Sequence, residues 1–339
     1  MKIERKITFE RNGKTIRRTL RADSEAEFNE KYNAILEQAA KESRITFERI
    51  SEEWEEQHFK NIAYGTQVCY TPALRRARDA FSDMALEDIQ PVDVKRLLDS
   101  LAMQKYSAKT VKMQKVVIGL VYKYAIVNGY ANSNPAEYVP LPKHLAVTER
   151  TPPSENTISI IKQNVSAPFG LFPLFLLYTG CRRGEALGVQ WSDIDFESNT
   201  IQIRRNIIFQ NNRSVVKNHL KTKSGTRIIP LLSPLRVALQ AQKRKSVYIF
   251  ANDDGTLLSE TQFNHRLNAY KKATGAEFTP HQLRHEYATI LYEAGVDEGA
   301  AQKIMGHADI RTTQNIYTHI RQSKIESAAV LLENQIQNS

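Results

Sequence analysis

Cysteine is scarce in this sequence, and no hydrophobic run is long enough to cross a membrane. The two cysteines, Cys69 and Cys181, lie far apart in 339 residues, which predicts neither a disulfide framework nor a cysteine-based metal site. The most apolar run, residues 169–178, covers about half a membrane span and contains Pro173, so we expect a buried core helix. Residues 1–14 lack the apolar segment of a signal peptide. We therefore expect a cytoplasmic protein without a membrane partner.

Clusters of carboxylates are also missing, so the sequence offers no set of oxygen ligands typical of magnesium. His281 and His285 stand four residues apart, a spacing that suits zinc on a helix. Arg284 lies between them, and its charge makes a dication unfavourable there. The sequence thus predicts no metal and no other cofactor.

Negative charge is in deficit. The chain holds 47 Lys and Arg residues against 37 Asp and Glu residues, which gives a formal net charge of +10 and a pI of about 9.4. A surface of this sign attracts polyanions, nucleic acid above all, although a merely basic protein would give the same count. The length of 339 residues is too great for one ordinary core, so we expect two or three domains.

The first predicted domain, residues 1–45, is a small basic unit of the α+β class. Alternating runs at residues 6–10 and 15–20 flank Asn12-Gly13, and Asn-Gly between such runs is a strong hairpin signal. A helix should follow over residues 24–38. A basic hairpin of this kind could enter a DNA groove or remain a solvated surface. The candidate DNA-binding residues of the hairpin are Arg17 and Arg18.

The second predicted domain, residues 46–145, is all helical. Periodic patterns at residues 45–60 and 67–82 predict two helices, and Pro91 is placed to begin a third. Another helix should follow Ser107. Prolines between residues 140 and 153 mark an exposed linker, the clearest domain boundary in the chain.

The helix after Ser107 has two contrasting sides. Lysines lie opposite its apolar face, where they could follow a phosphate backbone or form a solvated polar face. The expected apolar residues are Met113, Val117, Leu120, Val121 and Tyr124. The candidate DNA-binding residues are Lys109, Lys112, Lys115 and Lys123.

The third predicted domain, residues 150–339, is mainly α-helical with a small antiparallel sheet. Alternating runs at residues 199–209, 214–220 and 226–231 predict its strands. The side chains best suited to phosphate chemistry gather in this domain. They are Arg182, Lys223, His281, Arg284, His307 and Tyr317.

These side chains complement one another chemically. Tyr317 is a poor nucleophile near neutral pH, because a phenol has a pKa of about 10, so it needs cations nearby. Two guanidiniums, Arg182 and Arg284, can hold both non-bridging oxygens of a phosphodiester. An ammonium can protonate a leaving alkoxide, and histidines can bind phosphate or move a proton. Each residue alone is more often packing or surface charge; their combination favours a site for phosphoryl transfer without a metal.

Five motifs then appear in a fixed order over about 140 residues. They are Thr179–Glu185 (TGCRRGE), Thr222-Lys223-Ser224, His281–His285 (HQLRH), Met305-Gly306-His307 and Tyr317-Thr318-His319. Together they closely resemble the signature of the tyrosine recombinases, the phage lambda integrase family. The resemblance implies the tyrosine recombinase catalytic fold in residues 150–339, with a C-terminal tail helix. It further implies an arm-type DNA-binding domain in residues 1–45 and a helical, SAM-like core-binding domain in residues 46–145.

The resemblance also implies how the scissile phosphate is held and attacked. Arg182 and Arg284 would bind the phosphate, and His307 would hydrogen-bond it. Tyr317 would attack the phosphorus to give a 3′-phosphotyrosyl link, which the 5′-hydroxyl of a partner duplex reverses without ATP.

Proton transfer is implied for two further residues. Lys223 would be the general acid for the 5′-hydroxyl, and His281 would assist as acid or base. Lys221 lies two residues before Lys223 and would face the same side of a strand, so it is the alternative lysine.

The favoured function is integration and excision of a mobile element, either a prophage or a conjugative transposon. The basic N-terminal unit is additional to the layout of Xer proteins, and His307 and Tyr317 are ten positions apart, one more than expected for Xer. The alternatives are an Xer-type chromosome dimer resolvase, a catalytically inactive DNA-binding regulator and a type IB topoisomerase. The implied partners are double-stranded DNA attachment sites, other copies of the chain in a tetramer joined through the tail helix, an excisionase and a host DNA-bending protein. The protein would act at the nucleoid.

Overall fold

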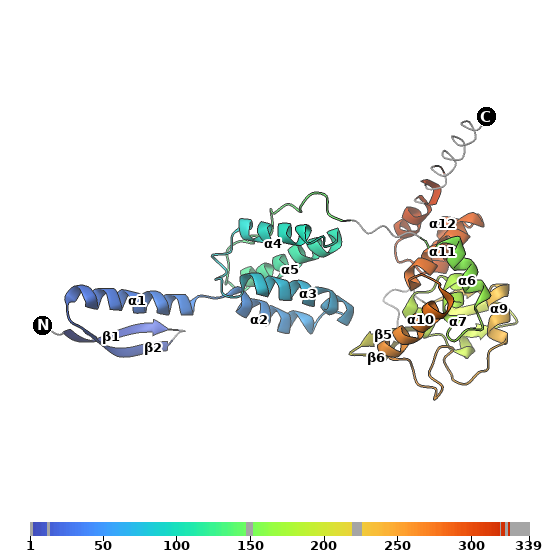
Figure 1. Cartoon of the computed structure of the whole chain (residues 1–339), viewed down its shortest axis with the longest axis horizontal. Helices are drawn as coiled ribbons and strands as arrows, with labels where there is room; N and C mark the ends of the chain where they lie inside the picture. Colours follow the sequence, from blue (N-terminus) through green and yellow to red (C-terminus); the bar gives the residue numbers. More distant parts are fainter. Residues whose placement is uncertain are drawn as a thin grey trace. The chain divides into compact units, whose positions relative to one another are not determined.

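The structure is a computed structural model that describes residues 3–11, 14–146, 152–218, 226–318, 320–322 and 325, without the side chains of residues 10, 11, 14 and 40–43. It divides into two compact units, Met1–Glu149 and Arg150–Ser339 (Figure 1). None of the described helices combines the length and the apolar character needed to cross a membrane.

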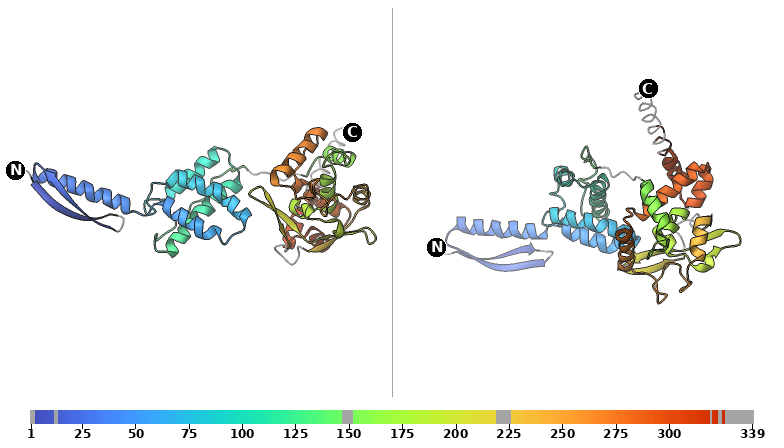
Figure 2. Two further views of the ribbon diagram at one scale, coloured as in Figure 1. Left: turned by 90° about the horizontal axis from the view of Figure 1, so that it is seen from below. Right: turned by 45° about the vertical axis from the view of Figure 1, so that its right-hand side comes forward.

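The first unit begins with the predicted hairpin. Strand β1 (Ile3–Arg11) pairs antiparallel with β2 (Lys14–Ala22), and helix α1 (Glu25–Ser43) lies along the hairpin (Figure 2). Ser24 begins the helix, because its Oγ accepts a hydrogen bond from the Glu27 amide at 3.1 Å. The hairpin and the helix are confirmed, and the helix runs five residues beyond its predicted end at residue 38. The small core between them comprises Ile7, Leu20, Ala22 and Phe28.

Four helices follow in the same unit. They are α2 (Phe47–Phe59), α3 (Tyr64–Phe81), α4 (Pro91–Met103) and α5 (Ala108–Val127). Pro91 occupies the first turn of α4, and the Ser107 hydroxyl caps α5 by accepting the Thr110 amide. Helix α5 packs against the other three, so its own apolar face forms much of the core.

The predicted apolar face of α5 is confirmed in part, since all five of its residues belong to the core of this unit or pack against it. Val117 and Val121 are fully buried as expected, but Met113, Leu120 and Tyr124 are only partly buried. The side chains that are buried instead are Val111, Gln114, Ile118, Tyr122 and Ala125. The hydrophobic pattern did not include Gln114, because this buried residue is polar. Its side chain donates to the Ala73 carbonyl at 2.8 Å and accepts from Arg76 at 3.0 Å.

The second unit is built around α7 (Leu171–Thr179), whose residues are buried except for Tyr178. This helix packs against four others. They are α6 (Glu155–Gln163), α8 (Arg183–Leu187), α9 (Ser233–Gln240) and α11 (Pro280–Glu293). The described part of the unit also contains α10 (Glu260–Thr274), α12 (Glu298–Met305), the short 3₁₀ turn η1 (Trp191–Asp193) and a helical segment over residues 310–318.

Two small antiparallel sheets complete this unit. Strands β3 (Ile194–Asp195), β4 (Thr200–Ile203) and β7 (Arg227–Pro230) form one sheet, while β5 (Asn206–Gln210) and β6 (Arg213–Lys217) form the other. The alternating run at residues 199–209 is therefore two strands in different sheets. The break falls at Arg204-Arg205, where Arg205 bonds the buried Asp193 carboxylate at 2.6 Å. Strand β3 was not predicted, because two residues carry no readable alternation.

Candidate active site

Three successive carbonyl groups at the C-terminal end of α12 each accept a hydrogen bond from a different arginine. The last carbonyls of a helix have no partner within it and carry the negative end of the helix dipole, so they attract guanidinium groups. The arginines come from three segments that are distant in sequence. The bonds are Arg227 Nε to the Ile304 oxygen (2.7 Å), Arg284 Nη2 to the Met305 oxygen (2.7 Å) and Arg182 Nη2 to the Gly306 oxygen (3.2 Å).

Arg284 is the most enclosed of the predicted phosphate-binding residues. It lies in α11, is 4% exposed, and also donates Nη1 to the Gly180 carbonyl at 2.5 Å. Burial, together with the nearby charge of Arg182, lowers the pKa of Arg284 to about 10, which still leaves it protonated at neutral pH. A buried cation next to a like charge is stabilised by an anion between the two, so this pair is suited to a phosphate.

Arg182 stands at the edge of the cluster. Its amide donates to Glu185 Oε2 at 2.9 Å, and its Nη1 donates to Glu185 Oε1 at 2.7 Å. Its side chain is 49% exposed, whereas that of Glu185 is 2% exposed. Glu185 thus fixes the position of Arg182, while the guanidinium of Arg182 remains accessible to a substrate.

Arg227, at the start of β7, is a site residue that the sequence analysis missed. Its Nη2 donates to Glu185 Oε2 at 2.9 Å, and its side chain is 5% exposed. Burial would raise the pKa of Glu185, but the charges of Arg227 and Arg182 hold that pKa at about 2. The signal was present: Arg227 occupies the inward face of an alternating strand, and a charge placed there needs a buried partner.

Two glycines of the motifs allow these contacts. Gly180 (φ +60°) ends α7, and a Cβ there would lie 2.3 Å from the ring of Tyr287. Gly306 (φ +67°) ends α12, and a Cβ there would lie 2.7 Å from the guanidinium of Arg227. Both positions combine left-handed backbone with a close approach, which only glycine tolerates.

His307 follows directly after this helix end. It is 7% exposed, and its Nδ1 lies 2.8 Å from the hydroxyl of Thr313. Burial, reinforced by the charges of Arg284 and Arg182, lowers the pKa of His307 to about 3. The imidazole is therefore neutral at physiological pH and acts through hydrogen bonds.

Tyr317 occupies a different environment. It is 3% exposed, its hydroxyl donates to the Val296 carbonyl at 3.3 Å, and its ring meets that of Tyr292 edge-on with centroids 5.1 Å apart. Burial, together with Asp297 and Glu298, raises the pKa of Tyr317. Val296 precedes α12, so Tyr317 is held near the N-terminal end of the helix whose other end holds the arginines. The phenol is thus protonated and packed in this state.

The other predicted site residues are less defined. His281 lies in the first turn of α11, exposed, one turn before Arg284. Lys223 and Lys221 lie outside the described residues, as do Ala328, Ala329 and Leu332 of the expected tail helix, whereas Ile325 is helical and exposed. Within the described part of the chain, no three His, Cys, Asp or Glu side chains are grouped so as to hold a metal ion.

The candidate DNA-binding residues differ in their surroundings. Lys109, Lys112 and Lys123 are exposed along α5. Lys115 instead donates to the carbonyls of Val139 (2.5 Å) and Glu137 (3.2 Å), so its ammonium is engaged by the chain itself.

The two hairpin arginines lie on opposite faces of the ribbon. Arg18 pairs with Ile7 in the strand register, so both lie on the face covered by α1, whereas Arg17 pairs with Thr8 on the outer face. Both arginines are exposed, and Arg17 is therefore the better placed of the two to meet a DNA groove.

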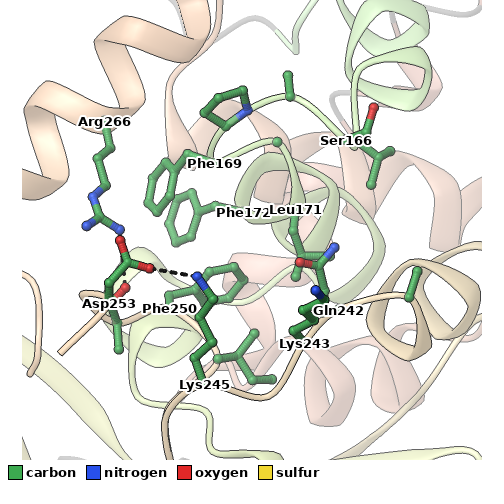
Figure 3. A pocket seen from close by; sticks show the side chains of 17 residues that line it. Ser166, Phe169, Leu171, Phe172, Gln242, Lys243, Lys245, Phe250, Asp253 and Arg266 are labelled. Carbon is green, nitrogen blue, oxygen red and sulfur yellow. Dashed lines mark hydrogen bonds and ion pairs between the residues drawn. The ribbon is translucent and has the colours of Figure 1, made fainter. Parts of the chain in front are cut away.

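A pocket elsewhere in the second unit is distinct from this site. It has a volume of about 480 Å³ and is lined by Phe169, Phe172 and Phe250 (Figure 3). Two of its basic side chains are already bonded within the protein: Lys245 to Asp253 at 3.1 Å, and Arg266 to the Ala251 carbonyl at 3.2 Å. The side chains drawn there include none of the predicted site residues.

Three arginines and the neutral His307 thus lie at the C-terminal end of α12, and Tyr317 lies near the other end of that helix. A profile of the Phage integrase family matches residues 156–324. A "Tyrosine recombinase XerC-like" of Caldanaerobacter subterraneus subsp. tengcongensis is 30% identical over 270 residues, which cover 70% of this chain and 69% of that protein. The chain therefore belongs to the phage integrase family of tyrosine recombinases, and it is a site-specific recombinase that cuts and rejoins DNA.

Further similarities agree with this family. The transposase of transposon Tn916 from Enterococcus faecalis is 25% identical over 270 residues, which cover 71% of this chain and 66% of that one. A structure of the Tn1549 transposon integrase with circular intermediate DNA has a TM-score of 0.68 at 20% identity, covering 84% of this chain and 99% of that one. A lambda integrase tetramer on a Holliday junction gives 0.63 at 19%, with 92% and 91% covered. The described fold is thus the tyrosine recombinase catalytic fold, mostly helical with small antiparallel sheets.

Proposed function

We propose that this recombinase integrates and excises a mobile DNA element, with Arg182, Arg284, His307 and Tyr317 as its central residues. One observation carries the proposal. The guanidiniums of exposed Arg182 and buried Arg284 and the neutral imidazole of His307 all lie at the C-terminal end of α12. A phosphodiester brings two non-bridging oxygens that only accept hydrogen bonds. Arginines at this site offer paired donors for both.

The reaction follows from these groups. The Tyr317 oxygen attacks phosphorus, the bond from phosphorus to the 5′-oxygen breaks, and the ammonium of Lys223 supplies a proton to the leaving 5′-oxygen. The phenol proton passes to a base, for which His281 is the candidate. Charge that develops on the non-bridging oxygens is stabilised by Arg182 and Arg284, which are already oriented before the substrate arrives. Attack by another 5′-hydroxyl reverses the step and conserves the bond energy.

Catalysis requires Tyr317 to leave its packed position. Release breaks one hydrogen bond to Val296, which contributes about 1 kcal/mol, and exposes part of an aromatic ring, which costs about 2 kcal/mol. Both are small enough for protein–DNA contacts to supply. The proposed resting state is therefore a recombinase whose phosphate site is assembled and whose nucleophile is stored.

The first unit would grip DNA. The outer face of the hairpin presents Lys6, Thr8, Arg17 and Thr19 to solvent, a row of donors that suits a DNA groove. The exposed lysines of α5 would follow a phosphate backbone. We accordingly assign residues 1–45 as an arm-type domain and residues 46–145 as a core-binding domain, in addition to the catalytic domain of residues 150–339.

A mobile element is favoured over a chromosomal site by the hairpin unit and by the similarity to the transposase of Tn916. Similarity to a XerC-like recombinase supports chromosome dimer resolution as the second candidate. Assembly into a tetramer through the tail helix is proposed by likeness to the lambda integrase tetramer. An excisionase and a DNA-bending protein remain predicted partners.

Covalent trapping tests the proposal. Full-length protein is mixed with nicked, fragmented DNA of the source organism and its circularised element, quenched in SDS, and the protein-bound ends are sequenced. Ends at one element junction, absent with Tyr317→Phe, are the expected result. Ends at a single chromosomal site without an element would favour the Xer function. DNA binding without any SDS-resistant link would contradict the proposed chemistry.

A further inference from the structure

His307 and Thr313 form a buried polar pair. The imidazole Nδ1 and the Thr313 Oγ1 are 2.8 Å apart, and Thr313 is 1% exposed. Thr313 lies in the helical segment over residues 310–318, one turn before Tyr317. A hydroxyl so completely buried in a helix otherwise made of exposed and apolar positions indicates a specific partner.

The backbone of His307 is fixed independently of this pair. Its amide donates to the Gln302 carbonyl at 3.2 Å, and its own carbonyl accepts the Gln302 side chain at 3.2 Å. The Cα position is therefore set by α12, and the bond to Thr313 governs the orientation and the proton of the ring.

The location of that proton matters because a bound phosphodiester oxygen only accepts hydrogen bonds. A neutral imidazole has one N–H and one lone pair. If the proton is on Nδ1, the ring donates to Thr313 and Nε2 carries only a lone pair. If Thr313 donates to Nδ1, the proton is on Nε2, where a phosphate can use it. Threonine can take either role, whereas the guanidiniums beside it are donors only.

We propose that Thr313 is a positioning residue that fixes the tautomer of His307: its hydroxyl donates to Nδ1 and thereby presents Nε2–H to the scissile phosphate. This inference rests on the proposed role of His307 in phosphate binding. Thr313 does not touch the substrate and acts only through the imidazole, as an outer partner orients a histidine in other sites.

Three variants separate the hydroxyl from packing. Thr313→Val keeps the shape and removes the donor, Thr313→Ser keeps the donor, and Thr312→Val makes the same change at the exposed neighbouring position. The measured quantity is the rate of covalent-adduct formation on a nicked attachment-site duplex at saturating protein, with DNA affinity and thermal unfolding measured in parallel. We expect Thr313→Val to slow the step at least about tenfold, short of the roughly 100-fold loss on deleting a preorganised donor outright. DNA affinity should be unchanged, and Thr313→Ser and Thr312→Val should stay near wild type.

Different failures are distinguishable. If Thr313→Ser loses as much rate as Thr313→Val, the methyl packing is responsible and the inference is overturned. Wild-type rates in Thr313→Val overturn it equally. If His307→Ala cleaves at the wild-type rate, the proposed role of His307 itself fails.

Imidazole ¹⁵N spectra give a readout that packing alone would not move. Full-length Tyr317→Phe protein with ¹⁵N-labelled histidine is bound to the same duplex, and the His307 signals are assigned with His307→Gln. Protonated Nε2 in the Thr313 protein and a mixture of tautomers after Thr313→Val are expected. Protonated Nδ1 in the Thr313 protein would contradict the inference.

Discussion

The two ends of α12 have different surroundings: three arginines bond its C-terminal carbonyls, and Tyr317 packs near its N-terminus. At the C-terminal end, Arg182, Arg227 and Arg284 are held by backbone carbonyls in positions that need no substrate. At the N-terminal end, Tyr317 is packed in an apolar cluster, and its hydroxyl donates to the Val296 carbonyl at 3.3 Å. In the proposed mechanism the phosphate site is therefore assembled in advance, while the nucleophile rests near the other end of the helix.

The difference follows from what each group must do. Arginines stabilise charge best when they are oriented before it develops, because reorienting them during the reaction would cost free energy. A nucleophile that forms a covalent link to DNA is harmful if it reacts without a partner duplex. In the proposed resting state, the hydrogen bond to Val296 and the contact with the Tyr292 ring are weak enough for modest contacts with DNA to release Tyr317.

The largest expected effect on the rate of adduct formation comes from changing an arginine at the C-terminal end of α12. Arg284→Lys keeps the charge but cannot reach both the Gly180 and Met305 carbonyls with fork geometry. We expect adduct formation to fall about 1000-fold, measured in SDS with a nicked duplex. Arg236→Lys, a change on the surface of the same unit, serves as control and should react normally. A loss under tenfold for Arg284→Lys would show that the fork geometry is not needed.

A smaller effect is expected from the carboxylate that joins two of the arginines. The pKa of Glu185 is about 2 in the folded chain and about 4.3 when unfolded. Its ionised form therefore stabilises the fold above pH 4.3, and that contribution disappears as pH falls toward 2. Glu185→Gln should lower the free energy of unfolding by about 3 kcal/mol at pH 7.

Urea unfolding at pH 7 and at pH 3 measures this contribution. The gap between wild type and Glu185→Gln should shrink at the lower pH, and exposed Glu197→Gln should change little at either. A gap that stays constant with pH would mean that Glu185 is not the stabilising anion.

A change beside Tyr317 should raise the rate of adduct formation rather than lower it. Tyr292→Leu removes the edge-on aromatic contact to Tyr317, which contributes about 1 kcal/mol, and so favours release. Single-turnover adduct formation should rise up to about fivefold, with thermal stability slightly reduced. An unchanged or lower rate would indicate that release of Tyr317 does not limit the reaction.

The smallest expected effect distinguishes two lysines of α5. Lys123→Gln removes an exposed charge and should reduce the slope of log affinity against log salt by about 1. Lys115→Gln, whose ammonium is bound to Val139 and Glu137, should leave that slope unchanged and lower stability instead. A slope for Lys123→Gln equal to that of the wild type would contradict a contact between Lys123 and DNA.

Much of the site could be predicted from the sequence, because its motifs depend on local geometry. Gly180 and Gly306, which end α7 and α12, stand within the motifs, and Glu185 holds Arg182 from three positions away. Arg227 was missed because its partners, Glu185 and Ile304, are distant in sequence. Thr313 was missed because its partner, His307, lies across a loop. The storage of Tyr317 could not be predicted either, since an aromatic residue on a helix gives no sign of which carbonyl its hydroxyl meets.

The positions of helices and strands were predicted more reliably than the pairing of strands into sheets. The hairpin, α1, the helices of the first unit and the buried helix α7 occur near their expected positions. The run over residues 199–209 alternates throughout, so its pattern could not show that β4 and β5 belong to different sheets. That division depends on the ion pair between Arg205 and buried Asp193, a tertiary contact.

In the proposed mechanism, Tyr317 is packed in the free protein and released when the protein binds DNA. A fluorotyrosine placed at position 317 of the full-length chain reports this by its ¹⁹F solvent-isotope shift, measured with and without a nicked attachment-site duplex. We expect the fluorine to be shielded from solvent in the free protein and exposed on DNA under conditions that yield adduct. A fluorine already exposed in the free protein, or one still shielded while adduct forms, would contradict it.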